Sequence, residues 1–398
     1  MSARTVVPES EMNRIRITGV KAFSFRQEMQ ALVKVETDAG IYGIGEAGAP
    51  GPVVRGHLKV MEPMLIGEDP LAIDRLFDTM TSQMHSSRAH IPTVSGVDIA
   101  LWDIAGKVMN RPMSDLLSGR FRDKVTIYHT PVEFPMPSDP DDRAAFREWA
   151  QKLTGHPEGY RIFKCGGAHM AWLPNPGRID SRAAAMSNTL TQADLHIVQK
   201  GNEVIREALG FGVDIIVHDH GQWDLPTAIG LSQAVEGIKP LWMEDTIPVW
   251  YSDEWKRFRE ASRVPVVTGE KLETVREFQP FIVNGAVDAI HPDLVYSGGI
   301  TGCRRIAQLA ELYYLPVAVH NVGSMVQNIA TAHFGAMVRN FVMAETRIYA
   351  RPEIREMCEE EVPIVGGELA VPTRPGLGIT LIPEVLRKYA GEGEPVWD

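Results

Sequence analysis

The segment Pro240–Glu270, PLWMEDTIPVWYSDEWKRFREASRVPVVTGE, contains the pattern that decides the fold. An apolar run, Pro240–Glu244, is followed by a helix-length stretch, Ser252–Ser262, and then by a second apolar run, Val264–Gly269. Each run ends at a glutamate or one residue before one. Repetition of such units predicts parallel strands that are joined by helices.

This unit recurs along most of the chain. Eight short apolar runs are predicted to be strands: Val125–Tyr128, Arg161–Cys165, Val213–His218, Pro240–Glu244, Val264–Gly269, Val287–Ile290, Leu315–His320 and Phe341–Glu345. The later runs are separated by predicted helices: Thr191–Leu209, Leu225–Val235, Ser252–Ser262, Thr274–Asn284 and Thr301–Tyr313. Eight such units predict an α/β fold that closes into a barrel.

The first part of the chain has a different pattern. Two alternating apolar runs, Ile15–Phe25 and Gln30–Val35, predict antiparallel strands. The stretch Asp98–Ala105 has apolar residues at the i+3 and i+4 spacings of a buried helix. After Glu345 the chain becomes irregular and rich in Pro and Gly, and we expect it to return to the first part.

Charge and composition narrow the class of protein. The chain has 40 basic and 51 acidic residues, so its net charge is 40 − 51 = −11, which disfavours nucleic acid and anionic membranes as partners. Residues 1–13 lack the apolar run of a secretory signal, and no segment resembles a membrane span. Three sparse cysteines, Cys165, Cys303 and Cys358, suit a reducing compartment. We therefore expect a cytoplasmic protein.

Ionisable side chains occur where the predicted strands end. In a parallel barrel the reactive groups lie at the C-terminal ends of the strands. These ends carry Lys164, His218, Glu244, Glu270, Asp293, His320 and Glu345. Six of these seven are acids or histidines, so the sequence predicts a catalytic centre at this end of the barrel.

Glu244 and Glu270 are candidate metal ligands. Both follow strands that look buried, where a carboxylate needs a partner. A hard cation such as Mg²⁺ takes oxygen ligands and keeps water or substrate oxygens in its shell. Pairing with Arg or Lys is the alternative, but two carboxylates on adjacent strands favour a metal.

The last strands carry a candidate base and a candidate acid. Asp293 beside His320 would fix the tautomer of the imidazole and raise its basicity, as a general base requires, although a structural pair is the alternative. Glu345 would donate a proton to a developing oxyanion if burial raises its pKa; otherwise it is a rim carboxylate.

The end of the third strand carries three polar residues in succession, His218, Asp219 and His220. His218 and His220 share one face of the strand, and Asp219 takes the other unless the backbone turns there. His220 is either part of the site or a rim histidine that bonds to a neighbouring carboxylate.

These residues resemble the enolase superfamily, and specifically its mandelate racemase-like branch, which contains acid-sugar dehydratases of the mannonate, galactonate and gluconate type. The resemblance extends from about Asn13 to the C-terminus and includes Gly43–Glu46, Asp98–Asp103, Ala286–Asp293 and Gly298–Thr301. It implies a modified (β/α)₇β TIM-like barrel under an α+β capping domain that is built from both termini. The implied divisions are residues 1–124 for the N-terminal cap, 125–369 for the barrel and 370–398 for the segment that packs back on the cap.

Spacing is the most specific part of this resemblance, since the family places three metal ligands at near-equal intervals. Here 270 − 244 = 26 and 244 − 26 = 218, while the dyad histidine and the last glutamate fall at 270 + 50 = 320 and 270 + 75 = 345. The family's first ligand is normally an aspartate, but His218 stands here and Asp219 follows it. Imidazole suits transition metals better than Mg²⁺. The expected cofactor is one divalent metal, Mg²⁺ first and Mn²⁺ or another transition metal as the alternative.

Two triplets separate dehydratases from racemases in this branch. The dehydratases carry His-Gly-Arg, whose histidine is a general acid, and the matching triplet here is His220–Gly221–Gln222. The racemases carry Lys-x-Lys, whose second lysine is a base, but here the triplet is Lys164–Cys165–Gly166. The resemblance therefore disfavours two-base racemisation and implies that Lys164 and Glu345 contact a substrate carboxylate.

The leading hypothesis is dehydration of a sugar acid to a 2-keto-3-deoxy acid. In it, His320 takes the α-proton and His220 protonates the departing 3-hydroxyl. One alternative is an epimerase or racemase of a 2-hydroxy acid, with Lys164 as the opposing base. The other is a binding or regulatory protein with a degraded metal site, which is motivated by His218 and Gln222.

Substrate specificity is expected from three loops, and the family resemblance also implies a symmetric homo-oligomer. The loops are Phe25–Gln30, Gly45–Val54 and a long flap from Gly166 to Leu190.

Overall fold

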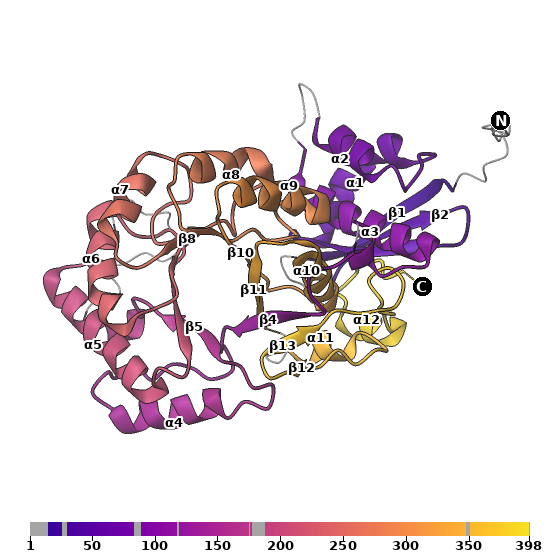
Figure 1. Cartoon of the computed structure of the whole chain (residues 1–398). Coiled ribbons are helices and arrows are strands. Elements are labelled where there is room, and N and C mark those ends of the chain that lie inside the picture. Colours follow the sequence, from indigo (N-terminus) through magenta and orange to yellow (C-terminus); the bar gives the residue numbers. More distant parts are fainter. Residues whose placement is uncertain are drawn as a thin grey trace, which may run out of the picture.

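The computed structural model describes residues 15–25, 30–82, 89–117, 119–174, 176, 188–347 and 351–397. A closed barrel of parallel strands forms its larger part (Figure 1). The barrel strands are β4 (Lys124–His129), β5 (Ile162–Gly166), β6 (Asp214–His218), β7 (Met243–Glu244), β8 (Val266–Thr268), β9 (Ala289–Ile290), β10 (Val317–Val319) and β11 (Phe341–Thr346). Each strand pairs with the next in sequence, and β11 pairs with β4 to close the barrel, so the predicted barrel is confirmed.

Helices surround the barrel (Figure 1). They are α4 (Arg143–Thr154), α5 (Gln192–Leu209), α6 (Leu225–Val235), α7 (Glu254–Ala261), α8 (Thr274–Val283), α9 (Gly299–Leu312) and α10 (Met325–Met337). Side-chain caps mark several starts; Thr191 and Asp194, for example, form a capping box at α5. The sequence patterns did not single out α10, because this helix is buried on nearly every side and has no polar face.

An antiparallel sheet and three helices form the cap beside the barrel. Its strands are β1 (Ile17–Ser24), β2 (Ala31–Thr37) and β3 (Tyr42–Ala47), and its helices are α1 (Gly51–Leu65), α2 (Ile73–Thr81) and α3 (Ile91–Met109). The third strand, β3, was not predicted, because its glycines hide the apolar alternation. A side chain at Gly43 would collide with the carbonyl oxygen of Ala100 on α3, so close packing of this helix on β3 requires glycine.

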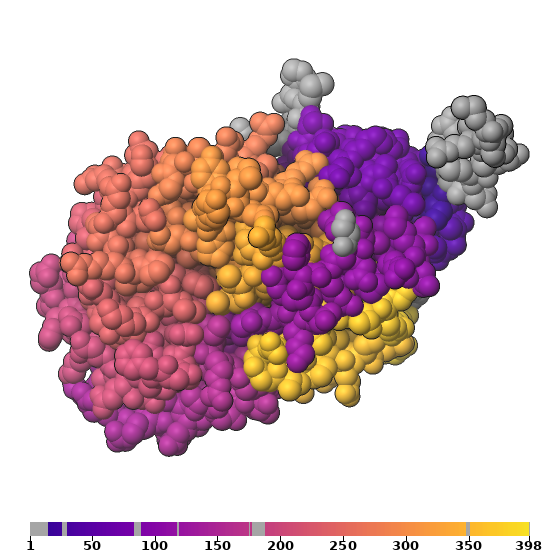
Figure 2. Space-filling model, viewed as in Figure 1, coloured from indigo at the N-terminus to yellow at the C-terminus, as the bar shows by residue number. Residues whose placement is uncertain are grey.

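The C-terminal residues return to the cap, as predicted. Phe25 forms a β-bridge with Ala390, and the Trp397 ring packs edge-on against Phe23 at 4.4 Å. In Figure 2 the yellow C-terminal residues lie directly against the violet N-terminal ones. This part contains α11 (Pro352–Glu356), β12 (Ile364–Val365), β13 (Glu368–Ala370) and α12 (Pro383–Tyr389), so it is more regular than its composition suggested.

Divisions of the chain at residues 124/125 and 369/370 remain our proposal. The second of these falls within β13, which pairs with β4 of the barrel. Short 3₁₀ turns lie at Met113–Asp115, Met170–Trp172 and Glu236–Ile238. Within the described residues, no helix is both long and apolar enough to cross a membrane.

An apolar layer fills the interior of the barrel. It consists of side chains from successive strands or the residues beside them, namely Tyr128, Ile162, Ile216, Trp242, Val267, Ala289 and Ala318, with Met343 packed against them. Side chains of a strand alternate between its two faces. The residue two positions later on each strand therefore also points into the barrel, closer to the C-terminal ends of the strands.

Candidate active site

This second inward-facing layer is polar and ionisable. Two positions after members of the apolar layer come Thr130, Lys164, His218, Glu244, His291, His320 and Glu345. Strand β8 is the exception, because the residue two positions after Val267 is Gly269 and its neighbour Glu270 carries the charge. The alternation of side chains along each strand therefore places most of the predicted strand-end residues in this second, inward-facing layer.

Gly269 allows Glu270 to join this layer. Its φ is +148°, and an added Cβ would lie 2.8 Å from the backbone carbonyl carbon of His291. Only glycine adopts this conformation readily. The backbone consequently turns at the end of β8, and the Glu270 carboxylate lies 3.4 Å from His320 Nε2.

His218, Glu244 and Glu270 form a group that could hold a metal ion. One ligand atom from each lies within 4.8 Å of the others, and His218 Nδ1 is 3.0 Å from Glu244 Oε1. Asp219 is not part of the group. Its side chain is buried, and Oδ1 accepts a 2.8 Å hydrogen bond from Trp223 Nε1. Of the two alternatives from the sequence, the geometry favours His218.

Lys164 is the buried cation of the site. Its Nζ donates to Glu244 Oε1 at 2.8 Å and to Glu345 Oε2 at 3.0 Å. Burial opposes the ammonium charge, but the two carboxylates outweigh this and raise the pKa of Lys164. Lys164 thus links a candidate metal ligand on β7 to the carboxylate on β11.

The expectation that burial raises the pKa of Glu345 is wrong for this structure. Burial does act in that direction, but Lys164 and His320 outweigh it and lower the pKa of Glu345. The carboxylate also accepts hydrogen bonds from the hydroxyls of Tyr128, at 3.1 Å, and Thr130. Glu345 is therefore a charged acceptor here rather than a proton donor.

Tyr128, Thr130 and His291 belong to the site, although the sequence analysis missed them. The Tyr128 hydroxyl lies 2.6 Å from His291 Nε2, and burial lowers the pKa of His291 to about 4. Tyr128 gives its single proton to Glu345, so neutral His291 donates from Nε2 to Tyr128. The signal that points to them is the period-two alternation that continues through the ends of β4 and β9.

Asp293 and His320 form a tightly positioned pair. His320 Nδ1 is 2.6 Å from Asp293 Oδ2, while Asp293 Oδ1 accepts from Gln327 Nε2 at 2.8 Å and from a backbone amide. This leaves His320 Nε2 facing the site, 3.4 Å from Glu270 and 3.8 Å from Glu345. Burial lowers the pKa of His320, but Glu270, Asp293 and Glu345 outweigh it and raise the value to about 9.

Glu46 connects the cap to this pair. It is a buried residue of β3 and accepts hydrogen bonds from the backbone N–H of Ser324, at 2.9 Å, and of Gln327, at 3.0 Å. These amides belong to the N-terminus of α10, where a negative charge is favourable. Gln327 in turn holds Asp293, so a cap residue supports the helix that positions the pair.

His220 lies beside the metal-type group. Its Nε2 is 3.0 Å from His218 Nε2, and burial together with His218 lowers the pKa of His220 to about 4. Gln222, which stands where the dehydratase triplet has arginine, accepts the His220 backbone N–H through Oε1 at 2.5 Å. Lys271 donates to the His220 carbonyl at 2.9 Å. Although Gln222 differs from the arginine of the family triplet, its side chain therefore holds the loop that carries His220.

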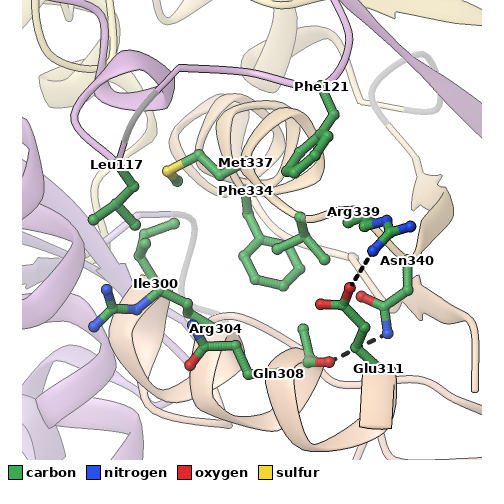
Figure 3. Close-up of a pocket in the computed structure, with 12 residues that line it drawn as sticks. Leu117, Phe121, Ile300, Arg304, Gln308, Glu311, Phe334, Met337, Arg339 and Asn340 are labelled. Atoms are coloured by element: carbon green, nitrogen blue, oxygen red, sulfur yellow. Dashed lines mark hydrogen bonds and ion pairs between the residues drawn. The ribbon is translucent and has the colours of Figure 1, made fainter. Parts of the chain in front are cut away.

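The site does not coincide with the cavity of about 610 Å³ between α9 and α10 (Figure 3). That cavity lies toward the N-terminal ends of the strands, beside Asn340, which precedes β11. Its lining includes Ile300, Phe334 and Met337 and an Arg339–Glu311 ion pair. None of the residues that line it belongs to the ionisable layer.

Two expected specificity loops are only partly described. Residues 26–29 of the first and residues 175 and 177–187 of the flap lie outside the described residues.

Comparison with known protein families identifies the class. The "Enolase C-terminal domain-like" family model matches residues 145–385, and the "Mandelate racemase / muconate lactonizing enzyme, N-terminal domain" model matches residues 4–118. The chain therefore belongs to the enolase superfamily, in its mandelate racemase/muconate lactonizing enzyme branch.

Curated relatives are named as dehydratases of sugar acids. D-xylonate dehydratase of Haloferax volcanii is 31% identical over 378 residues, which cover 92% of this chain and 87% of the relative. D-galactonate dehydratase of Variovorax paradoxus is 29% identical over 381 residues, which cover 92% of each. The chain is thus an enzyme of this superfamily, and its relatives are consistent with a hydro-lyase.

Solved structures agree with this assignment. A mandelate racemase/muconate lactonizing enzyme-like protein from Rubrobacter xylanophilus superposes with a TM-score of 0.84 at 28% identity, covering 96% of this chain and 99% of the other. An enolase superfamily member from Salmonella Typhimurium gives 0.82 at 26% identity, with 95% and 98% covered.

Proposed function

We propose that the protein is a metal-dependent dehydratase of a sugar acid. It would remove the proton α to the carboxylate and eliminate the 3-hydroxyl, giving a 2-keto-3-deoxy acid. The observation that carries this proposal is the pair of histidines at the group His218–Glu244–Glu270: His320, held by Asp293, and His220. The names of the curated relatives support a sugar acid as the substrate class.

His218, Glu244 and Glu270 would hold one divalent metal. When bound, the metal would stabilise negative charge on the substrate carboxylate and so acidify the α-proton. Two carboxylates suit Mg²⁺, while the imidazole shifts preference toward Mn²⁺ or another transition metal. Asp219 is the less favoured ligand, because Trp223 already occupies one of its oxygens.

His320 is the proposed base. Asp293 occupies the Nδ1 side, so Nε2 is the nitrogen that faces the substrate. Among the neighbouring charges, Glu270 contributes most to the raised pKa of His320. A cation bound to Glu270 would weaken that attraction, lower the pKa of His320 and free Nε2 to accept the α-proton.

His220 is the proposed acid, and Lys164 with Glu345 would contact the substrate carboxylate. The pKa of His220 is lowered to about 4, so its ring is neutral near pH 7 and would have to take up a proton before it could protonate the departing hydroxyl. The contact with His218 Nε2 offers a route for that proton. The Lys164 ammonium lies 3.0 Å from Glu345, so a substrate carboxylate that binds here would meet this donor. Glu345 accepts the Tyr128 proton in its charged form, and it would donate to the substrate carboxylate only after taking up a proton.

The epimerase alternative is less well supported. An opposing base needs a free lone pair, but the Lys164 ammonium donates to two carboxylates. Gly166, which stands where racemases have their second lysine, has no side chain.

A sugar-acid library that includes D-xylonate and D-galactonate tests the proposal. The full-length protein is assayed for 2-keto acid formation with Mg²⁺ and with Mn²⁺. At least one acid should be dehydrated, the activity should disappear in His320→Asn, and it should persist in His196→Asn, which changes an exposed histidine of α5. Exchange of the α-proton with solvent deuterium but no loss of water would instead establish an epimerase. If neither dehydration nor exchange occurs with either metal, the proposal fails.

A further inference from the structure

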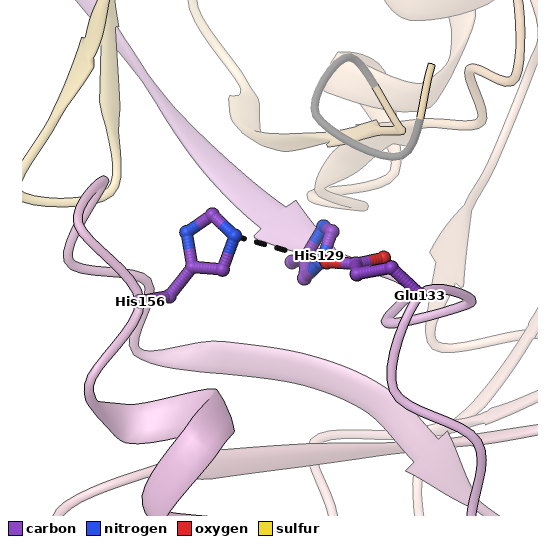
Figure 4. Close-up of side chains that lie close together, drawn as sticks. All are labelled: His129, Glu133 and His156. Atoms are coloured by element: carbon purple, nitrogen blue, oxygen red, sulfur yellow. Dashed lines mark hydrogen bonds and ion pairs between the residues drawn. The ribbon is translucent and has the colours of Figure 1, made fainter. Parts of the chain in front are cut away.

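A second group of histidine and carboxylate side chains lies on the outside of the barrel wall (Figure 4). His129 follows Tyr128 on β4, and because Tyr128 points into the barrel, His129 points outward. His129 is fully buried and stacks on Tyr160 with ring centroids 4.5 Å apart. Glu133 comes from the loop after β4, and His156 comes from the loop between α4 and β5.

Both histidines face the same carboxylate. His129 Nε2 lies 2.6 Å from Glu133 Oε1, and His156 Nε2 lies 3.7 Å from the same oxygen. One potential ligand atom from each residue lies within 4.8 Å of the others. The second oxygen of Glu133 is buried and has no hydrogen-bond partner in the part of the chain that the structure describes.

The remote ring nitrogens indicate how the two imidazoles are protonated. His129 Nδ1 is 3.4 Å from the carbonyl oxygen of Thr346, and His156 Nδ1 contacts the Glu158 carboxylate. Both partners are acceptors, so a ring that donates from Nδ1 presents the lone pair of its Nε2 toward Glu133. In that tautomer two lone pairs and a carboxylate converge on one point, where a cation would stabilise them. Without a cation, His129 would instead donate from Nε2 to Glu133 Oε1 at 2.6 Å.

A metal ion explains this arrangement better than protonation of both rings. Two adjacent buried imidazolium ions would repel each other, and their ring centroids are 5.5 Å apart. A histidine that binds metal commonly donates its other N–H to a carboxylate or a carbonyl, as both rings can do here.

We propose that His129, Glu133 and His156 bind a second divalent ion of the zinc class, with Glu158 orienting His156. Two imidazoles and one carboxylate are a common Zn²⁺ ligand set that leaves one position for water. The Glu133 side chain is 22% exposed, which opens a path for the ion. Bound metal would join the loop after β4 to the loop before β5.

The location gives this site a consequence for the catalytic centre. Tyr128 and Thr130, the neighbours of His129, both donate hydrogen bonds to Glu345 on the inside of the barrel. A metal at His129 would hold this end of β4 and stabilise the position of both donors. It would act by positioning them, without touching the substrate.

Metal counting on tag-free, full-length protein tests the proposal. Chelator-stripped protein is equilibrated with Zn²⁺, freed of unbound metal and analysed for zinc per chain; Co²⁺ absorption then reports the ligand set. We compare the wild type with His156→Gln and Glu133→Gln, with His196→Gln as the control. A second background, Glu270→Gln, weakens the group inside the barrel, so the count does not depend on the proposed function.

In the Glu270→Gln background we expect about one Zn²⁺ per chain, a tetrahedral Co²⁺ spectrum and a Zn²⁺-dependent rise in Tm. Adding either His156→Gln or Glu133→Gln should remove all three signals, while His196→Gln should keep them. Circular dichroism establishes that each variant is folded. The proposal is overturned if the Glu270→Gln protein binds no zinc, or if both outer-site variants retain zinc and the spectrum. If one variant does not fold, the other decides.

Discussion

Two clusters of histidine and carboxylate groups lie on opposite faces of one barrel wall. The barrel cluster, His218–Glu244–Glu270, takes its members from β6, from β7 and from the end of β8. The outer cluster, His129–Glu133–His156, takes them from a single β/α unit and its loops. The barrel cluster therefore depends on the register of three paired strands, whereas the outer cluster depends on local loop geometry.

The two clusters also differ in how their charge is balanced. Lys164 donates to Glu244 inside the barrel cluster, and His320 lies beside Glu270. In the outer cluster both neighbours of Glu133 are histidines, whose charge depends on protonation. The first cluster is thus stabilised by a permanent cation and lies next to the His320–Asp293 pair, and we expect chemistry there and structural support at the second.

Loss of His320 should have the largest effect on kcat and should distinguish the roles of the two clusters most clearly. His320→Asn removes the proposed base, so kcat should fall by about 10²–10⁴-fold. His156→Gln, in the outer cluster, should reduce kcat far less, because the carboxylates that His156 faces, Glu133 and Glu158, lie outside the ionisable layer. Similar losses in both variants would contradict the division of roles.

Removal of Lys164 tests the charge balance of the barrel cluster. In metal-free protein, Lys164→Met leaves Glu244 and Glu345 without their shared ammonium and should cost about 3–5 kcal/mol of unfolding free energy. Lys152→Met is the control, since its pair with Glu148 is solvent-exposed and should be worth less than about 1 kcal/mol. Urea unfolding with chelator gives both values, and equal values would refute the argument.

Gly269→Ala should disturb the barrel cluster alone. Alanine at a φ of +148° costs about 1–3 kcal/mol and displaces Glu270, so Mn²⁺ binding should weaken. Gly212→Ala is the matched control, because an added Cβ at Gly212 meets nothing within 4 Å. Calorimetric titration in the Glu133→Gln background isolates the barrel cluster. Unchanged Mn²⁺ affinity in Gly269→Ala would show that the glycine does not position Glu270.

The smallest effect concerns pH, and its sign differs between the clusters. The pKa of His320 is raised to about 9, so its contribution to metal-free stability is complete below about pH 6.5 and is lost as the pH rises through 9. The pKa of His156 is lowered, so the folded protein resists protonation of this ring. His156 therefore reduces the free energy of unfolding as the pH falls below about 6.5.

Thermal unfolding at several pH values measures both contributions. The Tm difference between wild type and His320→Asn should shrink above pH 9, whereas the difference between wild type and His156→Gln should change on the acid side. A common direction of change in both pairs would rule out opposite pKa shifts.

The sequence by itself determined the barrel and the line of ionisable strand ends. Apolar runs of period two and helical stretches of period 3.6 are local properties, and they repeat often enough to specify the order of the strands. It also placed His218, Glu244 and Glu270 at equal spacing, 26 residues apart. The short strand β3 and the buried helix α10 were not predicted from the sequence, because neither carries a clear alternation of polar and apolar residues.

Only the tertiary structure decided the rest. The entry of Tyr128 and His291 into the site and the lowered pKa of Glu345 depend on neighbours far away in sequence. The bond between Asp219 and Trp223 is local in sequence, but it forms only because the chain turns after β6. The outer cluster likewise exists only because the α4–β5 loop returns beside the end of β4. Residue types and their period are local, whereas burial, charge and ligand geometry arise when separate strands are brought into register.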